Sequence, residues 1–204
     1  MPGMTIRNAG SLLFFYNNMD KKRAILFIDG NNWYHNVKPL VEKPRSVNFK
    51  KLANIIAERF NLNIIEIRYY NSIPDIELGD EVYYKHMVFL TNLKKKGIVI
   101  NTRKLKKIKD NGKVIRVEKG VDVMISADMV SKTLLENKCD CCVLITGDSD
   151  FVPVMQLIKK ANKEVITTSV IKGYARELLQ GEFRFWILKK NDINKCIGNY
   201  NGQQ

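Results

Sequence analysis

The chain has 204 residues, of which 45% are hydrophobic and 27% charged, the composition of an ordinary soluble globular protein that can bury one core. Its formal net charge of +13 at pH 7 favours a polyanionic partner, nucleic acid ahead of a membrane surface, although a generally basic surface would give the same charge. No apolar run approaches the roughly 20 residues of a membrane span, so no transmembrane segment is expected.

The first half of the chain alternates predicted strands and helices. Residues 1–20 are expected to form a loosely attached N-terminal extension, and residues 21–190 a single folded domain. A short apolar run predicts a strand that ends at Asp29, and Asn48 suits the N-cap of a helix with apolar residues at helical spacing. The elements expected here are a strand at 24–28, a helix at 32–40, a helix after Asn48, a strand at 64–70, a helix at 79–95 and a strand at 98–100.

Residues 94–119 form a strongly basic segment. Asp110-Asn111-Gly112 contains an Asn-Gly turn signal, so residues 105–109 and 114–117 are expected to pair as a hairpin. A basic hairpin can contact a phosphate backbone, but a charged strand edge can also serve only to discourage strand pairing. The candidate nucleic-acid contacts are Lys94, Lys95, Lys96, Arg103, Lys104, Lys106, Lys107, Lys109, Lys113, Arg116 and Lys119.

The second half continues the alternation. Gly120-Val121-Asp122 opens a long helix, and residues 142–146 predict a strand buried on both faces. Ser149 is expected to cap the next helix, whose first turn tolerates Pro153. The remaining elements are a strand at 164–168, a short helix at 175–179, a strand at 183–188 and a frayed polar tail at 191–204. Alternating strands and helices predict an α/β fold with a central, mainly parallel sheet.

The four cysteines give no sign of a disulfide framework or a zinc site. Cys139, Cys141 and Cys142 crowd the start of a predicted strand, with no C-x-x-C pair and no histidine nearby. Strand alternation points Cys141 and Cys142 to opposite faces, where they act as small buried hydrophobic residues. Together with Cys196 they indicate a reducing compartment, and hence a cytoplasmic location.

Four carboxylates stand at loop-to-helix junctions: Asp29, Asp122, Asp148 and Asp150. The strands before Asp29 and Asp148 are the most apolar, so we expect them to be central and adjacent, with their acids at one end of the sheet. Close carboxylates repel unless a cation, a shared proton or strong hydrogen bonds offset the charge. Oxygen ligands favour Mg²⁺ or Mn²⁺ over zinc. Taken singly, Asp122 and Asp150 also suit helix starts, and Asp29-Gly30 a plain turn.

Three sequence blocks resemble the signature blocks of NYN domains, which belong to the PIN-like nuclease superfamily. They are Asp29-Gly30-Asn31-Asn32, Lys119-Gly120-Val121-Asp122 and Thr146-Gly147-Asp148-Ser149-Asp150-Phe151, in the family's order, and the LabA-like branch is the most similar. The resemblance spans about residues 23–189. It implies a PIN-like three-layer α/β/α sandwich and a metal-dependent ribonuclease site. Asp128 matches a further acid of that helix, which helical geometry turns away from Asp122.

On this resemblance the leading hypothesis is a Mg²⁺- or Mn²⁺-dependent ribonuclease, an endonuclease acting on single-stranded RNA. Asp29, Asp148 and Asp150 would hold a first metal, and Asp122 would complete that site or hold a second. Asn32 would orient a water or the scissile phosphate, and Ser149 would fix the turn by hydrogen bonding. The alternatives are a non-catalytic RNA-binding protein and a metal-dependent phosphatase. A homodimer is a further expectation, from the exposed edges of such a sheet.

Overall fold

The structure is a computed structural model, and it describes residues 21–110, 113–171, 173–181 and 183–197. The predicted extension at residues 1–20 and the end of the predicted tail, residues 198–204, lie outside the described residues. In the described part of the chain, no helix is both long and apolar enough to cross a membrane.

A parallel sheet forms the centre of the described chain. Its strand order is β3-β2-β1-β6-β7-β8, and each neighbouring pair is parallel. The α/β class is therefore confirmed, and β1 and β6 are adjacent and central because their unbroken apolar runs can be buried on both faces. The strands are β1 (Lys22–Asp29), β2 (Leu62–Ile73), β3 (Val99–Lys104), β6 (Cys141–Ile145), β7 (Glu164–Val170) and β8 (Arg184–Leu188).

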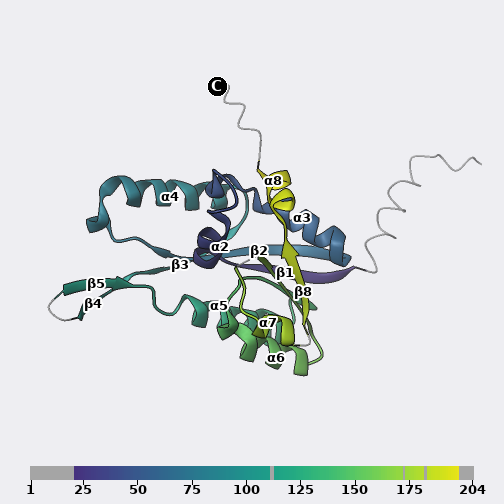
Figure 1. Cartoon of the computed structure of the whole chain (residues 1–204). Helices are drawn as coiled ribbons and strands as arrows, with labels where there is room; N and C mark the ends of the chain where they lie inside the picture. Colours follow the sequence, from purple (N-terminus) through teal and green to yellow (C-terminus); the bar gives the residue numbers. More distant parts are fainter. Residues whose placement is uncertain (1–20, 111–112, 172, 182, 198–204) are drawn as a thin grey trace, which may run out of the picture.

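Helices cover both faces of the sheet, which gives the predicted three layers (Figure 1). One face carries α2 (Gly30–Val37), α3 (Phe49–Phe60), α4 (Asp80–Lys95) and α8 (Lys190–Cys196), and the other carries α5 (Val121–Val130), α6 (Val152–Lys160) and α7 (Glu177–Gln180). Each face has its own core, because side chains alternate along the strands. Cys141 and Cys142 accordingly enter opposite cores, as predicted.

The basic hairpin is present where the sequence predicted it. β4 (Lys106–Asp110) and β5 (Lys113–Val117) pair antiparallel as a separate two-stranded sheet, which projects beside β3 (Figure 1). Short helical turns complete the described elements: η1 (Pro44–Ser46), η2 (Ile76–Leu78), the π-helical η3 (Ser131–Leu135) and η4 (Ser149–Phe151).

Two local predictions are wrong. Ser149 does not cap α6: Asp148 precedes the 3₁₀ turn η4 and accepts a hydrogen bond from the Asp150 amide (3.0 Å), and α6 follows with Pro153 in its first turn. The polar tail is also shorter than predicted, because residues 190–196 form helix α8. Ile193 and Cys196, one helical turn apart, are buried, and the Asn48 amide donates to the Cys196 carbonyl (2.9 Å). A short apolar stripe among polar residues therefore fixes this helix.

Candidate functional site

The chain changes direction between β1 and β6, and the candidate acids lie at this point. β1 leads into α2 on one face of the sheet, whereas β6 leads through η4 into α6 on the other. In parallel α/β sheets such a reversal opens a crevice outside the carboxyl ends of the two strands. Asp29 is the last residue of β1, and Asp148 follows the end of β6 by three residues.

Asp29 is the most buried of the four acids, with 4% of its surface exposed. The Asp29 Oδ1 accepts a hydrogen bond from the backbone amide of Asn32, and the Asp29 Oδ2 accepts one from the Thr146 hydroxyl, each 3.1 Å long. Burial, together with the charges of Asp122 and Glu118, raises the pKa of Asp29 to about 7, although both hydrogen bonds oppose the rise. At neutral pH this carboxyl group is therefore poised between its two protonation states.

Asp122 and Glu118 belong to the same electrostatic cluster. Partial desolvation and the charges of Asp148 and Asp150 raise the pKa of Asp122, which lies in the first turn of α5. Desolvation raises the pKa of Glu118 as well; the charge of Asp122 adds to this rise, whereas Ser72 and His35 oppose it. The structure thus brings the four predicted acids together and adds Glu118, which sequence reasoning missed. Its position directly before the Lys119–Asp122 block was the available signal.

Asn32 and Thr146 hold the two loops of the site in register. The Asn32 Oδ1 accepts from the Gly147 amide and from the Asn36 side chain, both at 2.8 Å. Thr146 donates to Asp29 and accepts from the Asp148 amide (3.2 Å), so it fixes the turn after β6. That role was predicted for Ser149, whose side chain has no hydrogen bond among the described residues.

Gly147 lies where two loops touch. A Cβ atom on Gly147 would stand 1.4 Å from the carbonyl oxygen of Gly173, so no side chain fits without moving backbone. Asn36 donates to that same carbonyl oxygen (3.1 Å), which ties α2 to the loop after β7. Glycine at this position is therefore required by close backbone approach.

We expect Gly147→Ala to lower the free energy of unfolding by about 1–3 kcal/mol, because the added methyl group forces the two loops apart. Chemical denaturation followed by circular dichroism measures the change. Ser149→Ala in the same turn is the control and should change stability by less than about 0.5 kcal/mol. Equal stability of Gly147→Ala and wild type would show that the loops can separate at no cost.

The acids have the chemical character of a site for a hard cation. They offer only oxygen ligands, and none of the five forms an ion pair with lysine or arginine within the described ranges. As the side chains stand, no three His, Cys, Asp or Glu residues of the described chain are arranged to hold an ion. The donor set therefore fits Mg²⁺ or Mn²⁺, while its coordination geometry is not preset.

The predicted RNA-binding residues have different surroundings in the structure. Lys107 and Arg116 on the hairpin form ion pairs with Asp75 and Glu77, with N–O distances of 2.7–3.3 Å, and so anchor the hairpin; their contact with RNA stays a prediction. Arg103 lies against Gly120, beside the acidic cluster. The other predicted contacts lie at the ends of elements: Lys94 and Lys95 end α4 and Lys96 follows it, Lys104 ends β3, Lys106 begins β4, and Lys119 precedes α5. The side chains of Lys109 and Lys113 are outside the described set.

Asp128 lies away from the cluster, as helical geometry predicted. Its Oδ2 accepts from Arg68 (2.8 Å) and from the Tyr70 hydroxyl (2.7 Å), and Arg68 is also paired with Glu66. This largely buried network joins β2 to α5. Asp128 therefore has a structural role.

Comparisons with known proteins agree with this architecture. Residues 23–187 match the NYN domain family. Over 179 residues, 86% of this chain and 87% of the relative, the sequence is 25% identical to the low amplitude and bright protein LabA of Synechococcus elongatus. A crystal structure of a protein of unknown function from Vibrio parahaemolyticus has the same fold, with a TM-score of 0.62 and 18% identity over 86% of this chain and 97% of that one. Since the family match spans most of the residues, the chain belongs to the NYN domain family of PIN-like nucleases.

Proposed function

We propose that this NYN protein is a cytoplasmic, Mg²⁺- or Mn²⁺-dependent endoribonuclease that hydrolyses single-stranded RNA. The observation that carries the proposal is the carboxylate cluster at the carboxyl ends of β1 and β6, in which burial and mutual repulsion raise the pKa values of Asp29, Asp122 and Glu118. A cluster of like charges without basic partners is destabilising by itself, and perturbed carboxylates in a crevice are typical of functional sites.

Each residue of the site has a separate proposed role in catalysis. Asp29, Asp148 and Asp150 would hold a divalent cation, with Asp122 and Glu118 completing the site or serving a second cation. Such a cation, when bound, lowers the pKa of an attacking water and neutralises the charge that builds up on the phosphodiester. Thr146 keeps the Asp29 carboxyl group in place. The side-chain oxygen of Asn32, Oδ1, accepts a hydrogen bond from the Gly147 amide and so holds the loop that carries Asp148. The side-chain nitrogen of Asn32, Nδ2, would then orient a water or the phosphate.

The test is incubation of the purified protein with end-labelled single-stranded RNA in Mn²⁺, in Mg²⁺ and in chelator. Internal fragments that form only with metal would support the proposal. Salt-sensitive RNA binding without cleavage would instead support a non-catalytic RNA-binding protein. That second candidate is favoured by one observation, namely that no three acids of the described chain are preset as metal ligands.

We expect Arg103→Ala to weaken RNA binding roughly uniformly across sequences and to reduce the slope of log affinity against log salt by about 1. The reason is the position of Arg103 against Gly120, which places its charge next to the phosphate that the acids would act on. Fluorescence anisotropy of labelled RNA in chelator, at several salt concentrations, measures both quantities.

Lys107→Ala is the matched control, because it removes a charge of the same sign that is already neutralised by Asp75 and Glu77. It should leave the salt slope closer to the wild-type value than Arg103→Ala does. The reverse order of the two slopes would move the RNA path from the β3 edge to the hairpin.

A further inference from the structure

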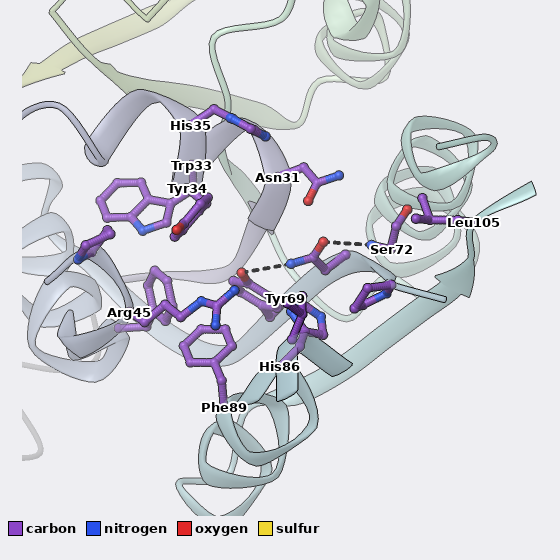
Figure 2. Close-up of a pocket in the computed structure, with 15 residues that line it drawn as sticks. Asn31, Trp33, Tyr34, His35, Arg45, Tyr69, Ser72, His86, Phe89 and Leu105 are labelled. Atoms are coloured by element: carbon purple, nitrogen blue, oxygen red, sulfur yellow. Dashed lines mark hydrogen bonds between the residues drawn. The ribbon is translucent and has the colours of Figure 1, made fainter. Parts of the chain in front are cut away.

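A cavity of about 240 Å³ lies between α2, α4 and the end of β2 (Figure 2). Its walls are largely aromatic: Trp33 and Tyr34 come from α2, Tyr69 from β2, and His86 and Phe89 from α4. The volume is below the roughly 300–1,000 Å³ of pockets for drug-sized ligands and suits a single ring system. None of the predicted functional residues lines this cavity.

Three buried polar atoms of the cavity walls, the Trp33 Nε1, the Ser72 Oγ and the His86 Nε2, lack partners among the described residues. The Trp33 Nε1 and the His86 Nε2 have no hydrogen bond among the described residues, although their side chains belong to residues only 4% and 7% exposed. Buried polar atoms are nearly always paired, and an unpaired one costs free energy. Burial and the nearby Arg45 charge lower the pKa of His86, so its imidazole is neutral at pH 7. A ligand that forms hydrogen bonds would satisfy these atoms.

Arg45 closes one side of the cavity with a charged plane. Its guanidinium carbon lies 5.3 Å from the centre of the Tyr34 ring and 6.0 Å from that of Phe89 (Figure 2). Arg45 has no acidic partner in the described part of the chain, so its five N–H donors are available. A planar cation among aromatic rings is the arrangement on which proteins stack unpaired bases.

The cavity and the acidic cluster share a wall. The Tyr69 hydroxyl lies against Gly30, the residue after Asp29, and the negative charge of Asp29 contributes to the raised pKa of Tyr69, which is mainly due to burial. On the same wall Ser72 lowers the pKa of Glu118. A base bound in the cavity and a phosphate at the acids could therefore belong to the same stretch of one RNA chain.

We propose that this cavity binds one unstacked nucleobase of the RNA, specifically a base that carries a ring carbonyl, and so selects the position of cleavage. The inference deepens the ribonuclease function proposed above and depends on it. The Trp33 indole and the Arg45 guanidinium can only donate hydrogen bonds, which matches the carbonyl oxygens of uracil, guanine and cytosine. Adenine has no carbonyl oxygen and is expected to bind most weakly.

The binding test uses Trp33 as its own reporter. The chain has 2 tryptophans, and the second, Trp186, does not line the cavity: it packs edge-to-face against Phe60 and lies under the Arg59 guanidinium. In a Trp186→Phe variant, kept in chelator so that no cleavage occurs, oligouridine should change the Trp33 fluorescence. RNA in which the nucleotide that would enter the cavity is abasic should bind at least about fivefold more weakly. Adenosine at that position should give intermediate affinity.

A double-mutant cycle then links the base to the cavity. Arg45→Ala should weaken binding of intact oligouridine but have no further effect on the abasic RNA, whereas Lys43→Ala, an exposed lysine nearby, should weaken both equally. Free uridine monophosphate serves as the other source of the same base. If it changes Trp33 fluorescence at lower concentration than oligouridine does, the cavity is a nucleotide site and the RNA assignment is overturned.

The outcomes separate this inference from the proposed function. Base-dependent Trp33 fluorescence without cleavage in Mn²⁺ would uphold the cavity assignment and overturn the nuclease. Metal-dependent cleavage with equal affinity for intact and abasic RNA at every position would uphold the nuclease and overturn the cavity assignment.

Discussion

Replacing Asp148 with asparagine is expected to reduce RNA cleavage by at least about 100-fold, the size of the loss when one charge-stabilising group is removed from an active site. The fold should survive, because the asparagine Oδ1 can still accept the hydrogen bond from the Asp150 amide that Asp148 accepts. Cleavage of labelled RNA in Mn²⁺ and thermal unfolding of the same preparations measure the two effects separately.

The control for this substitution is Asp80→Asn, which removes a carboxylate of the same kind from the exposed start of α4, away from the cluster. It should cleave RNA at the wild-type rate. Wild-type cleavage by Asp148→Asn would remove Asp148 from the catalytic residues and leave the proposal without its central group.

Replacing Asp29 with asparagine is expected to increase stability above neutral pH. The ordinary pKa of an aspartate is 3.8, and burial raises that of Asp29 to about 7 in the folded protein. The folded state therefore holds a proton that the unfolded chain releases, so wild-type stability is full below pH 3.8 and is lost as the pH rises through about 7. The loss amounts to about 4 kcal/mol, since each pKa unit corresponds to 1.36 kcal/mol.

Urea denaturation of wild type, Asp29→Asn and Asp80→Asn between pH 5 and pH 8 tests this sign. Stability should fall with pH in wild type and in Asp80→Asn and should fall much less in Asp29→Asn. Added Mn²⁺ should restore stability at pH 8 in wild type and in Asp80→Asn but not in Asp29→Asn, because a bound cation offsets the charge of Asp29. A lower stability of Asp29→Asn than of wild type at pH 8 would contradict the raised pKa.

The sequence by itself determined the fold class and the location of the acids. The spacing of apolar residues and the capping of helices are local properties of the sequence. The apolar runs of β1 and β6 therefore predicted strands buried on both faces, and Asn48 caps α3 as predicted. A carboxylate that ends such a strand can only lie at the carboxyl edge of the sheet, so Asp29 and Asp148 were placed together before any contact was known.

Only the tertiary structure decided which groups work together. Thr146 holds Asp29 across two strands, and Lys107 is neutralised by residues 30 or more positions away in the chain. The cavity likewise assembles Trp33, Arg45 and His86 from three separate elements. Local patterns encode the period of an element and the residues at its ends, whereas hydrogen bonds, ion pairs and cavity walls depend on distances between elements that only packing fixes.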